Sequence, residues 1–266
     1  HQRWAAASYR CAREVSTLGA RDDTPPGLAT LRRALARRSV SWGAPMTEHD
    51  FVATIGATEA ITLALRAVAR PGDAVVVESP TYFGILQTIE ALGLKVVEVP
   101  AHPRTGIDLA ALHDALKATP IRAIVTMPTA ANPLGSIMPD EAKAALYALA
   151  VRHDVPIIED DVYGELCFDG ARPRPIKAWD KDGRVLLCGS VSKTLAPGYR
   201  VGWIAPGRYQ DDIERLKFSQ SLACPTLTGM AVAEMLSSGS YDRHLRRLRH
   251  VVAGQVARYR EEGLVI

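Results

Sequence analysis

The sequence contains little cysteine: four widely scattered residues in 266, with no CxxC pair among them. Structural zinc sites usually draw on closely spaced cysteine pairs, so we expect no metal site of that kind. Four cysteines are also too few to suggest a disulfide framework in so long a chain. This scarcity favours a reducing compartment, and a cytoplasmic location is the expectation.

Long apolar runs are missing as well. No segment reaches the length of about 20 apolar residues that a membrane-spanning helix needs, and no secretory signal peptide is visible. We therefore expect no membrane partner. The chain begins at His1 rather than at methionine, and we expect that an upstream segment has been removed.

A large excess of charge of one sign is also absent. The formal net charge is +3, which is too small to indicate nucleic-acid binding. Arginines do cluster near the N-terminus, at Arg32, Arg33, Arg37 and Arg38. This cluster is either a solvated helix face or a surface that meets an acidic partner.

A regular alternation of strand-like and helix-like stretches is present instead. Strands are predicted at residues 51–55, 74–77, 95–99, 123–127, 155–158, 185–187 and 201–204. Helices are predicted at residues 58–69, 82–92, 108–118 and 140–153. This alternation predicts an α/β fold with a doubly wound, mostly parallel sheet.

The ends of the chain depart from this alternation. Residues 1–45 are predicted to form an N-terminal arm with helices around a break at Pro25-Pro26-Gly27. Residues 46–240 form the predicted large domain. Residues 241–266 are predicted to be a long, arginine-rich helix.

Lysine and serine follow the predicted strand at 185–187. In doubly wound sheets, ligands bind beyond the carboxyl ends of the strands, so these loops are the expected place for chemistry. Lys193 is either a surface lysine or a Schiff-base lysine, whose amine must lose its proton through burial or a cationic neighbour. The hydroxyls of Ser190 and Ser192 would suit phosphate oxygens.

Two further segments suit an anion. Arg200 carries a guanidinium fork that matches phosphate, although a surface ion pair is the simpler interpretation. Ala57 and Thr58 follow Gly56 at the start of a predicted helix, and a helix N-terminus favours an anion. Many ordinary strand–helix turns have the same composition.

Three other segments carry groups that suit a flat, charged ring. Asp160 lies in a run of three acids after a predicted strand, and either caps a helix or pairs with a pyridinium nitrogen. Tyr163 and Asn132 would donate hydrogen bonds to a phenolic oxygen on such a ring. Tyr82 would stack on its face, or else pack at a helix start.

The order and spacing of these segments resemble those of fold-type I enzymes that use pyridoxal 5'-phosphate (PLP), of the aminotransferase class. The resemblance covers residues 20–240 and implies the large domain of that fold, with Lys193 forming a Schiff base with PLP and exchanging it with an amino acid. Lys193 would then act on the substrate as general base. The implied cofactor contacts are Ala57, Thr58, Tyr82, Asn132, Asp160, Tyr163, Ser190, Ser192, Lys193 and Arg200.

Five segments are similar to the aminotransferase-like domains of MocR/GntR-type transcription regulators: 26–32, 78–84, 159–166, 189–204 and 241–248. This resemblance implies an effector domain that binds an amino acid or amine. It also implies a homodimer that contacts DNA only through a winged-helix domain outside this chain. Stand-alone aminotransferases have similar sequences in these segments. The alternative function is therefore transfer of an amino group between an amino acid and a 2-oxo acid. A PLP-free binding domain is a third hypothesis, which the presence of Lys193, Asp160 and Arg200 disfavours.

Two departures from the family pattern affect the site. The small C-terminal domain that usually supplies an arginine for the substrate carboxylate is largely absent from this chain, so that arginine has no candidate. Arg21, Asp22 and Asp23 stand where the family often has a tyrosine that reaches the partner subunit's phosphate.

Overall fold

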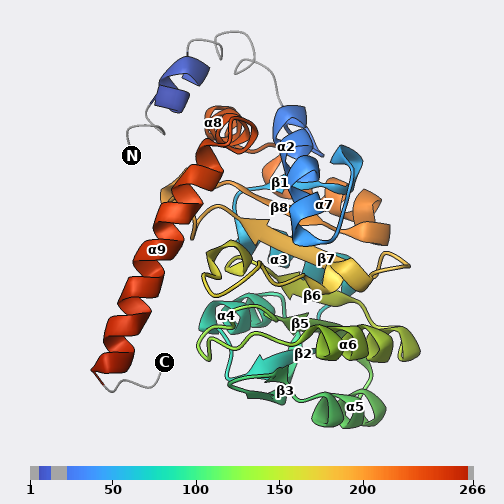
Figure 1. Cartoon of the computed structure of the whole chain (residues 1–266). Helices are drawn as coiled ribbons and strands as arrows, with labels where there is room; N and C mark the ends of the chain where they lie inside the picture. Colours follow the sequence, from blue (N-terminus) through green and yellow to red (C-terminus); the bar gives the residue numbers. More distant parts are fainter. Residues whose placement is uncertain (1–5, 13–22, 263–266) are drawn as a thin grey trace.

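An eight-stranded sheet lies at the centre of the computed structural model, which describes residues 6–12 and 23–262 (Figure 1). The strand order is β1-β8-β7-β6-β5-β2-β3-β4. The strands are β1 (Val52–Thr54), β2 (Ala74–Ser79), β3 (Lys95–His102), β4 (Gly106–Ile107), β5 (Ile121–Thr126), β6 (Ile157–Asp160), β7 (Val185–Ser190) and β8 (Gly202–Ala205).

The strand directions bring most loops with predicted chemistry to one edge. Neighbours from β3 through β2, β5 and β6 to β7 pair in parallel. β8 is antiparallel to both β7 and β1, so β1 runs in the same direction as β7. The carboxyl ends of β1, β2, β5, β6 and β7 therefore meet at the same edge of the sheet.

Helices cover both faces of this sheet. From α2 onward, the helices of the molecule are α2 (Ala29–Ser39), α3 (Ala57–Val68), α4 (Phe83–Ala91), α5 (Leu109–Ala118), α6 (Asp140–Arg152), α7 (Gln210–Ser221), α8 (Thr226–Ser237) and α9 (Ser240–Glu261), the last of which runs beside the sheet (Figure 1). In β2, Val75 and Val77 pack in the cluster that holds α3 and α4, whereas Val76 packs with α5 and α6. The continuous apolar run of this strand is thus buried on both sides, and the predicted doubly wound fold is confirmed.

Three elements of the structure were not predicted from the sequence: β4, α7 and α8. β4 has two residues, too few for a recognisable pattern. α8 contains threonines and a central Gly229, which lower helix propensity. α7 buries Lys217, whose Nζ lies 2.8 Å from a carboxylate oxygen of Glu59. That pair joins residues 158 positions apart, so no local pattern could have revealed it.

Two of the four clustered arginines on α2, Arg33 and Arg37, are exposed, as expected for a solvated helix face, whereas the other two are part-buried. Arg38 donates hydrogen bonds to the carboxylates of Glu165 and Asp242. Arg32 donates to the carbonyl oxygens of Gly27 and Glu48. Both interpretations from the sequence are therefore wrong for these two arginines, because the groups that they meet belong to the chain itself.

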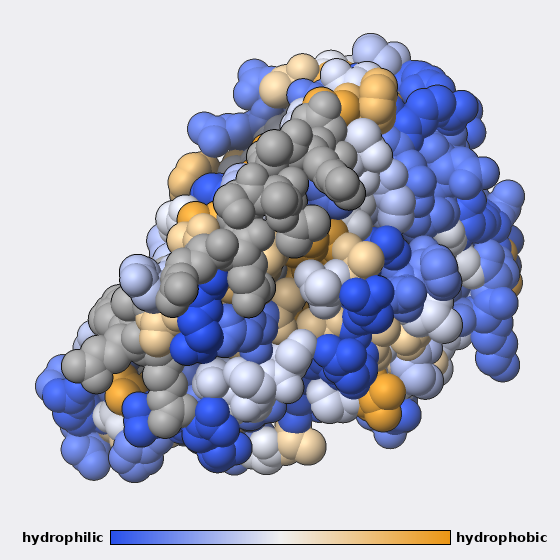
Figure 2. Space-filling view, turned by 90° about the horizontal axis from the view of Figure 1, so that it is seen from above, coloured by the Kyte–Doolittle hydropathy of each residue, from blue (hydrophilic) through white to orange (hydrophobic). Residues whose placement is uncertain are grey.

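The long helix predicted at 241–266 corresponds to α9, which begins at Ser240. The predicted division into three parts stays a prediction, and part of the N-terminal arm, with Arg21 and Asp22, lies outside the described residues. In the view from above, hydrophobic residues form separate spots among hydrophilic ones (Figure 2). Among the described residues, no helix combines the length and apolarity needed to cross a membrane.

Candidate functional site

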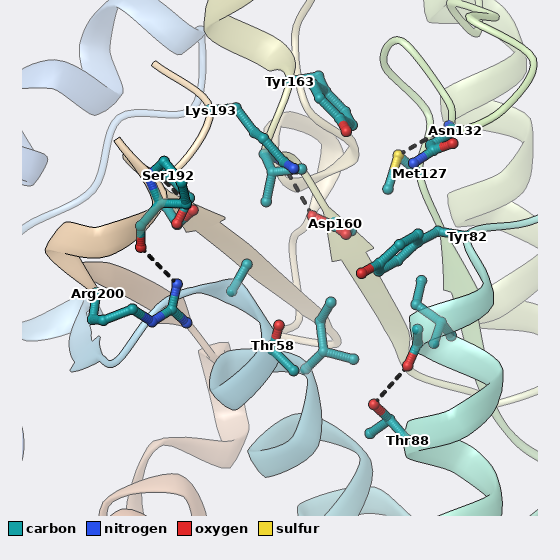
Figure 3. Close-up of a pocket in the computed structure, with 17 residues that line it drawn as sticks. Thr58, Tyr82, Thr88, Met127, Asn132, Asp160, Tyr163, Ser192, Lys193 and Arg200 are labelled. Carbon is teal, nitrogen blue, oxygen red and sulfur yellow. Dashed lines mark hydrogen bonds between the residues drawn. The ribbon is translucent and has the colours of Figure 1, made fainter. Parts of the chain in front are cut away.

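The loops at the carboxyl edge of the sheet surround a cavity of about 170 Å³ (Figure 3). Every residue that the sequence singled out for a cofactor contact lines this cavity. These are Ala57, Thr58, Tyr82, Asn132, Asp160, Tyr163, Ser190, Ser192, Lys193 and Arg200. Segments up to 143 residues apart, from Ala57 to Arg200, are thus brought together by the strand order.

Arg200 reaches the cavity by a different route from the other residues. It precedes β8 instead of following a strand, so the expectation that the chemistry lies in the loops after the strands is wrong for this residue. Because β8 is antiparallel to β7, its amino end lies at the same edge as the carboxyl end of β7. Arg200 adopts a left-handed backbone conformation, with φ of 51°, which is uncommon for a residue with a side chain.

The guanidinium of Arg200 is held by two backbone carbonyl groups. Nη2 donates to the oxygen of Ile55 at 2.7 Å, and Nη1 donates to the oxygen of Pro197 at 3.1 Å. Gly56 lies directly beneath this group, since a Cβ built on it would stand 2.5 Å from Nη2. Gly56 also has a φ of 93°, so both space and backbone conformation favour glycine.

More hydrogen-bond donors lie on the same side of the cavity as Arg200 (Figure 3). Ala57 and Thr58 begin α3, where first-turn N–H groups have no partner within the helix. The backbone N–H of Ser192 donates to Oγ of Ser190 at 3.1 Å, which leaves the Ser190 hydroxyl hydrogen available. This side of the cavity is built to receive an anion.

The acidic run from Glu159 to Asp161, at the carboxyl end of β6, separates into three environments, two of them internal. Glu159 accepts hydrogen bonds from two backbone N–H groups at the start of η4 (Ile176–Trp179), at 2.7 and 3.1 Å. Burial nevertheless raises the pKa of Glu159 to about 7. Asp161 forms a buried ion pair with Arg172.

Asp160 is the member of this run that faces the cavity. It is 4% exposed and accepts a hydrogen bond from the backbone N–H of Val162 at 3.2 Å. Within the described part of the chain it forms no ion pair. Burial raises the pKa of Asp160 to about 7, and the positive charge of Lys193 opposes that rise. A cationic group in the cavity would therefore find a buried carboxylate in need of a partner.

Lys193 enters the cavity from the turn after β7 and points toward Asp160 (Figure 3). Its Nζ lies 5.8 Å from the centre of the Tyr163 ring. Lys193 is exposed. The described residues therefore do not provide burial, which was one of the two ways expected for its amine to lose its proton. Asp160, Tyr163 and Asn132 surround the space in front of its amine.

Tyr82 closes the opposite side of the cavity (Figure 3). Its ring centre lies 5.0 Å from that of Phe83, at an interplanar angle of 57°. The ring also lies over Gly84, where a Cβ would approach it to 2.5 Å. The aromatic ring of Tyr82 thus lies against the next two residues of the chain.

Several lining residues were not predicted from the sequence. They are Ile61, Gly84, Ile85, Thr88, Met127, Val162 and Pro197. Met127 accepts the backbone N–H of Asn132 at its Sδ, 3.3 Å away. These residues adjoin the predicted motifs in sequence, and that proximity was the available signal.

Known proteins similar to this chain include both transcription regulators and aminotransferases. The model of the family "Aminotransferase class I and II" matches residues 19–260. An uncharacterized HTH-type transcriptional regulator of Escherichia coli, YjiR, is 47% identical over 237 residues, 89% of this chain and 50% of the regulator. Aromatic-amino-acid aminotransferase 1 of Thermococcus litoralis is 34% identical over 232 residues, 85% of this chain and 55% of the enzyme.

A solved structure extends this similarity to three dimensions. LysN, an alpha-aminoadipate aminotransferase of Thermus thermophilus complexed with N-(5'-phosphopyridoxyl)-L-leucine, has a TM-score of 0.86 at 29% identity. The match covers 94% of this chain and 64% of that one. The chain spans about half the length of the curated relatives it matches. The family and this complex indicate PLP as the cofactor. The chain belongs to the aminotransferase class I and II family.

Proposed function

We propose that this chain is a PLP-binding aminotransferase domain in which Lys193 attaches the cofactor covalently through its ε-amine. The observation that carries the proposal is the buried Asp160 carboxylate, which faces the same cavity as Lys193 and has one backbone hydrogen bond. The protonated ring nitrogen of PLP would supply the missing cationic partner. The residues present therefore fit this group.

The donor-rich side of the cavity would hold the phosphate. Arg200 has guanidinium N–H groups beyond the two that donate to the backbone. Ser190, Ser192 and the first amides of α3, at Ala57 and Thr58, complete the donor set. A hydrogen bond to a charged group contributes about 1.5–3 kcal/mol, so several would retain the cofactor.

The opposite side would hold the ring. Tyr82 would stack on its face, since its side chain borders the cavity and is exposed enough to meet a bound ring. The Tyr163 hydroxyl and the Asn132 side-chain amide have no hydrogen-bond partner within the described part of the chain. Both would donate to the phenolic oxygen of the ring.

PLP, when bound, supplies an electron sink for the carbanion left at the substrate Cα. Asp160 would keep the ring nitrogen protonated and so maintain that sink. Lys193 would remove the proton from the substrate Cα and return it, because its amine lies free once an amino acid takes its place. The exposure of Lys193 leaves room for this movement.

For the whole protein we propose a MocR/GntR-type transcription regulator, with this chain as its effector domain for an amino acid or amine. The identity to YjiR, 47%, exceeds the 34% identity to the Thermococcus litoralis aminotransferase, and this difference favours a regulator. DNA would be bound through a helix-turn-helix region outside this chain. A homodimer and a cytoplasmic location belong to the same proposal, the latter supported by four free cysteines.

A stand-alone aminotransferase is the second candidate, favoured by the Thermococcus litoralis relative and the LysN structure. It would transfer an amino group between an amino acid and a 2-oxo acid. Both candidates share the cofactor site and differ in turnover. Amino transfer at many turnovers without DNA binding would support the enzyme, whereas ligand-dependent DNA binding by the full-length protein would support the regulator.

The visible absorbance spectrum after adding PLP tests the shared site. We expect a new band that shifts when a suitable amino acid is added. A band without a shift would mean that the cofactor site is intact and the substrate site is not. No band from a sample with normal circular dichroism would contradict the proposal.

A further inference from the structure

The residue after Lys193 is tied to α9 by two hydrogen bonds. The Tyr241 hydroxyl donates to Oγ1 of Thr194 at 2.8 Å, in a buried position. Nε2 of His244 lies 2.6 Å from the backbone carbonyl oxygen of Thr194. A carbonyl oxygen only accepts, so Nε2 carries the proton and donates. One side-chain group and one backbone group of Thr194 are thus held by the same helix.

Tyr241 is itself fixed in place. It is 1% exposed, and the guanidinium of Arg38 lies 4.5 Å from its ring centre. Arg38 in turn donates to the carboxylates of Glu165 and Asp242. Burial raises the pKa of Tyr241, so its hydroxyl keeps the proton that it donates to Thr194.

The same helix also holds the turn that follows Tyr163. Nε of Arg249 donates to the backbone oxygen of Glu165 at 2.7 Å, and Nη2 donates to its carboxylate at 3.2 Å. Glu165 lies in η3 (Gly164–Leu166), two residues after Tyr163. α9 is therefore hydrogen-bonded to two turns that carry cavity residues, although α9 itself contributes no residue to the cavity lining.

We propose that Tyr241 and His244 are positioning residues, which hold the Lys193 turn through Thr194 and so direct the lysine amine into the cavity. The inference rests on the proposed function of Lys193 and extends it to two residues that touch neither cofactor nor substrate. An amino acid that takes the place of Lys193 would act on a turn joined directly to α9.

Hydrogen exchange of the full chain, without PLP, tests the holding of the turn. We expect Tyr241→Phe and His244→Leu to speed amide exchange in residues 190–195 about fivefold, since the first removes a buried hydrogen bond and the second a part-buried one. His244→Gln keeps a donor at the same reach and should restore slow exchange. Arg247→Ala, on the exposed side of α9, is the matched control and should change nothing.

A second measurement links the turn to the cofactor. In the PLP-loaded chain, we expect Tyr241→Phe and His244→Leu to weaken the visible circular dichroism of the cofactor at least twofold, because a loosely held lysine fixes it less rigidly. Exchange that is unchanged, or that accelerates equally in β5 and β6, would overturn the inference. If the unaltered chain binds no PLP, the proposed function fails, and exchange at residues 190–195 still decides whether α9 holds the turn.

Discussion

Nη2 of Arg200 donates a 2.7 Å hydrogen bond to the carbonyl oxygen of Ile55, 145 residues earlier in the sequence. This bond joins the loop before β8 to the loop after β1, and it lays the guanidinium over Gly56. The two loops thereby form one continuous row of donors at the edge of the sheet. The proposed phosphate side of the cavity depends on this contact.

Gly56→Ala should weaken PLP binding about tenfold or more, because the new Cβ would displace the guanidinium of Arg200 and remove a charge-assisted hydrogen bond. Titration of PLP by absorbance measures the change. Gly72→Ala is the matched control: Gly72 has nearly the same φ, 91°, with nothing within 4 Å of its Cβ position. It should destabilise the fold by about 1–2 kcal/mol and leave PLP affinity unchanged. Equal effects on affinity would refute the role given to Arg200.

Asp160→Asn should stabilise the PLP-free chain relative to the unaltered chain, and this difference should grow as the pH rises. Burial raises the pKa of Asp160 from its ordinary 3.8 to about 7, so the native state binds more protons than the unfolded chain between these values. Stability that this group contributes at acid pH is therefore lost as the pH rises through about 7. The asparagine variant escapes this loss, by on the order of 4 kcal/mol at pH 8.

Urea unfolding between pH 4 and pH 8 measures this difference in the free energy of unfolding. Asp114→Asn, at an exposed position on α5, gives the baseline for loss of a carboxylate. The Asp160 variant should also lose amino transfer about a hundredfold or more, because the ring nitrogen loses its partner. A stability difference that is the same at every pH would contradict the assignment of a buried, unpaired carboxylate.

Arg172→Gln should destabilise the chain by about 3–5 kcal/mol, since it leaves the buried carboxylate of Asp161 without its cation. Arg174→Gln serves as the control, because the ion pair of Arg174 with Asp140 is half-exposed. Its loss should cost about 1 kcal/mol or less. Thermal and urea unfolding compare the two variants. A similar loss of unfolding free energy in both variants would mean that Arg172 does not stabilise the buried carboxylate of Asp161.

The sequence was a good guide to the sheet and to the cavity. Apolar runs such as β2 are buried on both faces, and this made them readable as parallel strands. The predicted cavity residues other than Arg200 could be identified because each lies at or soon after such a strand end. Arg200 is the exception, because it precedes a strand and only the antiparallel pairing of β8 brings it to that edge.

Other features depend on contacts between distant segments and could not be predicted. The acids from Glu159 to Asp161 look alike in the sequence, yet one meets backbone amides, one faces the cavity and one meets Arg172. The internal role of Arg38 depends on Glu165, 127 residues away. Such pairings follow from the way separate elements pack against one another, which no local pattern encodes.

Borohydride reduction of the PLP-treated chain, followed by peptide mass spectrometry, tests the central claim most directly. Reduction fixes PLP to the amine that it has joined. We predict one phosphopyridoxyl group on Lys193 in the unaltered chain, and none at the corresponding peptide in Lys193→Ala. Labelling at a different lysine, or equal labelling of the alanine variant, would contradict the assignment of Lys193 as the cofactor-binding residue.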